Sequence, residues 1–152
     1  MTESNEIIKI ADIHEKRIKS ALKHIQNLFP INAQIVENLS EEDLAWIDLL
    51  INRFGKLQDI IGAKIIDLFL EAEQENVESL TILDKVNKLE RLGLIEDAEL
   101  WKEMRRARNH VAHEYPDTPS LMVKYLNQIF ELTPKLLIIF KNIKNRIDSH
   151  EQ

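Results

Sequence analysis

Cysteine is absent from the sequence, and glycine and proline are rare, with three and four residues respectively among 152. The lack of cysteine excludes disulfides, thiolate metal sites and thiol nucleophiles, and it fits a reducing compartment, so we expect a cytoplasmic protein. With 44% hydrophobic and 30% charged residues, the composition is globular and favours helices over a turn-rich β architecture.

Long hydrophobic runs are also lacking. No apolar stretch approaches the roughly 18 residues that a membrane-spanning helix needs, and the opening MTESNEIIKI lacks the basic region and long apolar stretch of a signal peptide. We therefore expect neither membrane insertion nor export. The formal net charge of -6 excludes the broad basic surface of a general nucleic-acid coat protein, so that any nucleic-acid site must be local.

Apolar residues recur along the chain at spacings of three and four, which is the pattern of amphipathic helices. The predicted helices cover residues 5–29, 44–75, 81–92, 96–116 and 119–147. Ser40 and Thr118 have side chains suited to N-terminal caps, and Gly93 suits the left-handed position that ends a helix. Because the connections are short, successive long helices should pack antiparallel. The sequence predicts one all-α domain over residues 1–152, an antiparallel four-helix bundle with an additional short helix.

Two glycines, Gly55 and Gly62, stand seven residues apart on one side of the second predicted helix. Each costs about 1 kcal/mol relative to alanine inside a helix, so some other interaction should offset that cost. Close approach of a neighbouring helix is one interpretation. Space for a ligand or a partner is the other.

The segment 105–116, RRARNHVAHEYP, concentrates positive charge in an otherwise acidic chain. Three of the seven arginines lie in it, namely Arg105, Arg106 and Arg108, and so do two of the five histidines, His110 and His113. We expect the chemistry of the protein to be concentrated in this segment.

Arg108 interrupts an apolar seam of the fourth predicted helix. The seam consists of residues at three- and four-residue spacing, Trp101, Met104, Arg108, Val111 and Tyr115. A guanidinium is costly to bury without a partner, so it needs a carboxylate, carbonyl groups or a phosphate, unless its stem carries it out to water. A structural ion pair with an acid such as Asp59 and a phosphate-binding role both meet this requirement.

A second face of the same helix brings together polar residues at spacings of three, four and seven, which are Arg106, Asn109, His110 and His113. On an ideal helix, Arg108 and His113 point about 140° apart and are separated by roughly 7.5 Å along the axis. Their side chains would therefore meet best in a shared cleft, such as one between two subunits.

At these positions the sequence resembles the HEPN superfamily, whose signature is an arginine, usually followed by a polar residue, and then a histidine after four to six intervening positions. Arg108, Asn109 and His113 match this signature. The longer pattern Arg108-x4-His113-x-Tyr115 is similar to that of the HepT-type toxins, which pair with a small nucleotidyltransferase of the MNT type. The segment RFGKLQD, residues 53–59, also looks like relatives of this group.

The resemblance implies a HEPN-like bundle that acts as a homodimer and as the toxin of a prokaryotic toxin–antitoxin pair. Its activity would be that of a metal-independent endoribonuclease without cofactors, with Arg108, Asn109 and His113 as catalytic residues. An imidazole titrates at about 6.5 and can take the proton of the RNA 2′-hydroxyl, and a guanidinium can stabilise the phosphorane-like transition state. Further contacts to the RNA substrate would come from Arg105, Arg106 and His110.

Tyr115 precedes Pro116, a position that disfavours helical geometry, so its hydroxyl should be reachable by another protein. By the resemblance, this tyrosine is adenylylated by the nucleotidyltransferase antitoxin, and the AMP would add bulk and negative charge beside the cationic cleft. Tyr115 is equally well explained as the last apolar residue of the seam. The sequence leaves open whether the antitoxin acts by modification or by blocking.

Two other functions fit the same residues. One is a noncatalytic substrate-binding or partner subunit of a nucleotidyltransferase, which the acidic overall charge favours. The other is a plain dimerising bundle, in which the cationic cluster balances acids such as Asp59, Glu103 or Glu114.

A metal site at His110, His113 and Glu114 is disfavoured, because these three potential ligands do not have the spacing of common helical zinc motifs. The remaining histidines should face solvent, namely His14, His24 and His150.

Overall fold

The computed structural model describes residues 2–113 and 118–150, and every regular element in these ranges is a helix or a helical turn. In chain order these are α1 (Glu3–Ile25), η1 (Gln26–Leu28), α2 (Ala33–Glu37), α3 (Glu41–Ile60), η2 (Ile61–Ile65), α4 (Ile66–Ala72), η3 (Val77–Ser79), α5 (Ile82–Arg91), α6 (Ala98–His113) and α7 (Pro119–His150). No strand occurs in the described ranges. The predicted all-α class is confirmed.

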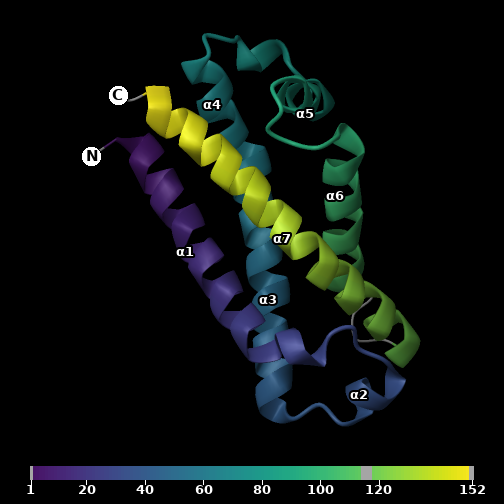
Figure 1. Cartoon of the computed structure of the whole chain (residues 1–152). Helices are drawn as coiled ribbons and strands as arrows, with labels where there is room; N and C mark the ends of the chain where they lie inside the picture. The colour runs from purple at the N-terminus through teal and green to yellow at the C-terminus, as the bar shows by residue number, and fades with distance from the viewer. Residues whose placement is uncertain (1, 114–117, 151–152) are drawn as a thin grey trace.

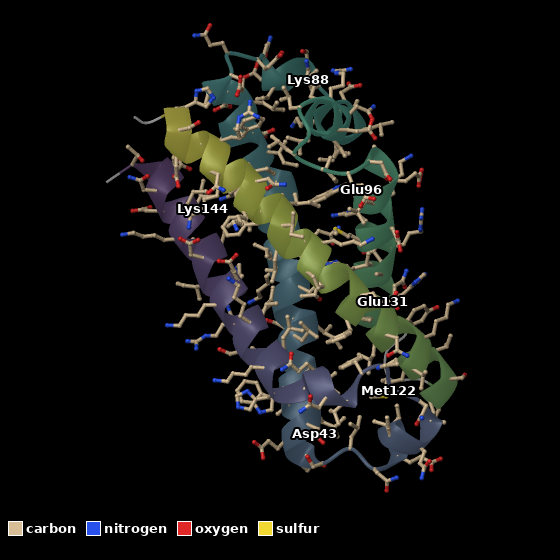
Figure 2. The ribbon with its side chains drawn as sticks, viewed as in Figure 1. Asp43, Lys88, Glu96, Met122, Glu131 and Lys144 are labelled. Atoms are coloured by element: carbon tan, nitrogen blue, oxygen red, sulfur yellow. The ribbon has the colours of Figure 1, made fainter. Side chains whose placement is uncertain are left out.

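Four long helical segments form the body of the molecule, namely α1, α3 with its continuation α4, α6 and α7 (Figure 1). Successive members run in opposite directions, and the first and last described residues lie at the same end of the bundle. Along the bundle α1 packs against α3, and α7 packs against both α4 and α6. Lys144 of α7 reaches α1, where its Nζ donates to Asp12 Oδ1 at 2.8 Å (Figure 2).

The predicted start and stop signals act where the sequence indicates. Ser40 caps α3, because its Oγ accepts from the backbone N–H of Asp43 at 3.0 Å. Thr118 Oγ1 accepts from the N–H of Leu121 in the first turn of α7 at 3.3 Å. Gly93 has a φ of 74°, the left-handed conformation that ends α5 without a steric cost.

The second predicted helix differs from the expectation at its centre. It is interrupted between α3 and α4 by the π-helical turn η2, which spans Ile61–Ile65 and includes Gly62. Such a turn holds one residue more than an α-helical turn, and it often lies close to a functional site. The three- and four-residue spacing of apolar residues does not distinguish this π-helical turn from a regular α-helix, so the sequence alone predicts one uninterrupted helix.

The short helix α5 is fastened to two of the long helices. Lys85 Nζ of α5 lies 2.7 Å from Asp67 Oδ1 of α4, and Glu90 Oε1 of α5 accepts from the backbone N–H of Ala98 at 2.8 Å. The second contact satisfies one of the free N–H groups at the start of α6. These contacts hold α5 beside the N-terminal half of α6.

The prediction that His14 faces solvent is wrong. Its side chain lies on the stripe of α1 that packs against α3, and the residue is only 8% exposed. Arg53 Nη1 of α3 donates to His14 Nδ1 at 3.0 Å, so the imidazole accepts in its neutral form. Burial, and then the charges of Arg53 and Lys56, lower the pKa of His14 from its ordinary value.

None of the described helices is both long enough and apolar enough to cross a lipid bilayer.

Candidate functional site

Arg108 points from α6 toward α3. Its Nη2 donates to Asp59 Oδ2 at 2.8 Å, and its stem lies over Gly55, where a Cβ would be 3.3 Å from Arg108 Nε. Because Gly55 has no side chain, the guanidinium can reach Asp59 close to the backbone of α3. This is the ion pair that the sequence offered as one of two explanations for an arginine in the apolar seam.

Asp59 also faces a second arginine of α6. Its Oδ1 lies 3.9 Å from Arg105 Nη1, a longer contact. The side chains of Arg105, Asp59 and Arg108 are 52%, 45% and 33% exposed. Pairs with this exposure contribute only about 0–1 kcal/mol to stability, because water screens them. One carboxylate therefore faces two guanidinium groups at the surface, and the cluster keeps a net positive charge.

The side chain of Trp101 lies against Gly62 in the same way as the side chain of Arg108 lies against Gly55. A Cβ on Gly62 would lie 3.1 Å from Cζ2 of the Trp101 ring. The two glycines are seven residues apart, and so are Trp101 and Arg108 on α6. The earlier glycine faces the later residue of α6, as expected for antiparallel helices. One interpretation of these glycines from the sequence is close approach of a neighbouring helix backbone, whereas in the structure the atoms nearest to each glycine belong to a side chain of α6.

Two grooves open along α6, and Asp59 lines both of them. The polar groove, of about 380 Å³, is lined on α3 by Asp48, Ile51, Asn52, Gly55, Lys56 and Asp59 and on α6 by Arg108, Val111 and Ala112. The apolar groove, of about 600 Å³, is lined by Asp59, by Gly62 and Ala63 of η2, by Ile82 of α5, and by Trp101, Lys102, Arg105 and Arg106 of α6. Each glycine also lines a groove, Gly55 the polar one and Gly62 the apolar one, and a ligand or partner in either groove stays a prediction.

The other predicted residues of α6 occupy two different surroundings. Arg106 and Asn109 are exposed, and Arg106 lies on the rim of the apolar groove. The ring of His110 instead packs on Tyr125 of α7 with ring centroids 4.5 Å apart. Its Nδ1 is buried and has no hydrogen-bond partner among the described residues. His110 therefore faces α7 and lines neither groove.

His113 is the last residue of α6 and lies one turn beyond Asn109 on the helix. Its side chain, and the whole of Tyr115, lie outside the described part of the chain. The structure consequently brings together Arg105, Arg108 and Asp59, with Arg106 close by. That His113 and Arg108 meet in a shared cleft stays a prediction.

Within residues 2–113 and 118–150, no group of three histidine, aspartate or glutamate side chains is placed to hold a metal ion. The described cluster around Asp59 combines one carboxylate with two guanidinium groups, and guanidinium groups are hydrogen-bond donors that bind anions. Its chemistry is therefore suited to a phosphate or a carboxylate ligand.

No protein-family model, no curated protein and no solved structure matches this chain. The likeness to the HEPN superfamily thus depends on Arg108, Asn109, His113 and Tyr115 and on the segment 53–59.

Sequence reasoning named Asp59 as a possible partner of Arg108 but overlooked the rest of the α3 side of the polar groove. Asn52, Lys56 and Asp59 follow one another at spacings of four and three, on the side of the helix that also carries Gly55. Lys102 likewise precedes Arg105 and Arg106 on α6 by three and four residues. These spacings are a readable signal, because residues three and four apart share a helix face.

Proposed function

We propose that the chain is a metal-independent endoribonuclease of the HEPN type and the toxin of a prokaryotic toxin–antitoxin pair. The observation that carries the proposal is the setting of Arg108. Its guanidinium is anchored through one nitrogen to Asp59, is one-third exposed, and stands in the wall of a groove. This setting leaves part of the Arg108 side chain open to a second ligand in the groove.

The anchored guanidinium keeps donors for a second anion. Arginine has five N–H donors in a planar fork, and among the described residues Asp59 engages Nη2 of Arg108. The donors that remain can bind two oxygens of a phosphodiester, and the contact to Asp59 holds the fork in one orientation. Pre-oriented donors stabilise charge that develops in a transition state without first having to reorganise.

His113 supplies the proton transfer in this proposal. RNA carries its own nucleophile, the 2′-hydroxyl, whose proton passes to the imidazole as its oxygen bonds to phosphorus, and the 5′-oxygen leaves with a proton from a second histidine. Asn109 would orient the imidazole or the phosphate. Because Arg108 faces α3 and the position of His113 follows that of exposed Asn109, the two groups meet most readily in a cleft formed by two copies of the chain.

The partner in this proposal is a nucleotidyltransferase of the MNT type. Adenylylation of Tyr115 would place a phosphate group close to the C-terminal end of α6, where it would repel the phosphates of RNA. Noncovalent covering of the same end would have a similar result. We expect the protein to act in the cytoplasm, where its RNA substrates lie.

A second function is favoured by one specific observation. The Arg108–Asp59 pair at 2.8 Å neutralises the arginine in part, as a purely structural pair would. The same geometry therefore also fits a noncatalytic subunit that binds a nucleotidyltransferase or its substrate. The two functions differ in whether His113 is needed.

Expression of the intact chain in bacteria tests the proposal. We expect growth arrest, loss of arrest with His113→Ala and with Arg108→Ala, and no effect of His24→Ala, which changes an exposed histidine of α1. The purified protein should cleave RNA in EDTA.

Arrest that persists in His113→Ala, or cleavage that stops in EDTA, would contradict the ribonuclease mechanism. A soluble, nontoxic protein that binds a nucleotidyltransferase would support the noncatalytic function.

A further inference from the structure

The floor of the apolar groove takes no part in the cleavage chemistry proposed above. Gly62 and Ala63 form it together with Trp101, Ile82 of α5 lies opposite, and the volume of the groove is about 600 Å³. Ligand sites in proteins usually measure about 300–1,000 Å³ and are lined mainly by apolar side chains. A groove of this size and composition is suited to a ligand with apolar groups.

The walls of this groove are held in place before any ligand binds. Gly62 allows the Trp101 ring to lie against η2, since a Cβ there would come within 3.1 Å of the ring. The opposite wall is α5, which Lys85 ties to Asp67 of α4 at 2.7 Å. A preformed site loses little entropy on binding, and this favours affinity.

Apolar surface continues from the groove onto α5. Ile82, in the lining, is 48% exposed, and its neighbour Leu83 is 45% exposed. Ile82 thus carries the apolar lining of the groove out to the surface, and Leu83 adds a second exposed apolar side chain at the start of α5, from both of which a partner could remove water. Phosphate and ribose groups would gain little from such a surface.

The α6 rim of the groove is positively charged, although the chain as a whole has a net charge of -6. Lys102 is half-exposed, and its ion pair among the described residues is to an exposed acid, Glu99, at 3.4 Å. Arg105 lies 3.9 Å from Asp59. Arg106 is exposed and has no ion-pair partner within the described ranges. Lys102 lies about one helical turn before the adjacent Arg105 and Arg106, so the three cations line one edge of the groove and can face the carboxylates of a ligand.

We propose that the apolar groove binds an acidic amphipathic helix of a partner protein. Its apolar side chains would lie on Ile82 and the groove floor, and its carboxylates would face Lys102, Arg105 and Arg106. A helix is the favoured form because the surrounding elements are helices and the groove offers no strand edge. The proposal is independent of ribonuclease activity, because binding can be measured without cleavage.

A designed peptide provides the probe. It has about 16 residues, enough to form a helix on binding, with leucine at three- and four-residue spacing and glutamate on both flanks. Binding is followed by Trp101 fluorescence in a Trp46→Phe background and by calorimetry. We expect Ile82→Glu and Arg106→Glu each to weaken binding about tenfold or more, as for central interface residues. Matched changes on α1, Ile13→Glu and Arg17→Glu, should leave it within about twofold.

Four results would overturn the proposal. One is no binding of the glutamate peptide at millimolar concentration, and another is equal binding of a peptide with lysine in place of glutamate. The third is that the protein binds single-stranded RNA but not the peptide, and that RNA binding is abolished by Arg106→Glu and unaffected by Ile82→Glu. This result would assign the groove to RNA. Dissociation of a solution dimer by Ile82→Glu would instead assign it to a second copy and would equally overturn the proposal.

Discussion

The polar and apolar grooves both lie along α6, and each has a glycine in its lining, yet the side chains over these glycines are of opposite character. Over Gly55 lies the stem of Arg108, which ends in an exposed ion pair. Over Gly62 lies Trp101, which is 4% exposed. A single helix interface can thus place a charged site and an apolar site next to each other, because a spacing of seven residues returns to the same helix face. The stability and the binding properties of the two grooves should differ accordingly.

The largest expected difference between the grooves is in stability. Trp101→Ala removes a buried ring and should lower the free energy of unfolding by about 3–5 kcal/mol. Arg108→Ala removes a screened ion pair and should lower it by about 1 kcal/mol or less. Urea unfolding of the purified variants at neutral pH measures both values.

Trp101→Phe supports this comparison, because it keeps an aromatic ring and should fold even if the alanine variant does not. Equal losses for the Trp101 and Arg108 variants would mean that the polar groove is as much a part of the core as the apolar one.

The charge of Asp59 should affect RNA binding through the polar groove. Asp59→Asn keeps the shape of the side chain and removes the negative charge between Arg105 and Arg108. We expect RNA affinity to rise about threefold to tenfold and to depend more steeply on salt, as for any gain in positive charge facing phosphates. Binding of labelled single-stranded RNA in a His113→Ala background measures this effect without cleavage.

Glu78→Gln of η3 is the matched control, since it removes an exposed charge elsewhere and should leave RNA affinity unchanged. If Asp59→Asn also leaves RNA affinity unchanged, the arginines of α6 do not bind phosphate, and the noncatalytic function gains support.

The helices were predictable from the sequence because their apolar residues and caps follow simple local rules. Ser40, Gly93 and Thr118 act through neighbours within a few residues. Asp59 could be named as a partner of Arg108 because a seam arginine requires an acid, but the choice between Asp59 and other acids depends on how two distant helices align.

Burial between helices was harder to predict. His14 is polar, and a sequence does not show that Arg53, thirty-nine positions away, will donate to it across the α1–α3 contact. The groove at Gly62 also depends on η2 and on α5, which meet only in the folded chain.

A second comparison concerns the two sides of α3. Toward α6 it has the exposed Asp59, and toward α1 it has Arg53, which donates to the buried His14. The pKa of His14 is lowered from the ordinary 6.5, so the unfolded chain binds a proton more readily than the folded one. The contribution of His14 is fully present above about pH 6.5 and is lost as the pH falls below it toward the lowered folded-state pKa.

We therefore expect the free energy of unfolding to fall between pH 7 and 5, and His14→Gln to reduce that slope, because glutamine can accept from Arg53 and does not titrate. Urea unfolding across this range gives both slopes. Glu73, whose pKa is also lowered, mainly through a hydrogen bond from His150, acts only at more acidic pH, below its ordinary value of 4.5. An unchanged slope in His14→Gln would mean that His14 is not the group that titrates.

The smallest expected effect compares the two glycines directly. Gly55→Ala places a Cβ 3.3 Å from Nε of Arg108, and Gly62→Ala places one 3.1 Å from Cζ2 of Trp101. The Arg108 side chain is flexible and one-third exposed, so it can move by a few tenths of an ångström, whereas the indole of Trp101 is fixed by its burial. Alanine gains about 1 kcal/mol over glycine from helix propensity. Gly55→Ala should keep most of this gain, and Gly62→Ala should lose it to displacement of the ring, which leaves a difference of about 1 kcal/mol in the free energy of unfolding. Equal stabilisation by both substitutions would show that the Trp101 ring can shift, and a floor that shifts would lack the rigidity assigned to the apolar groove.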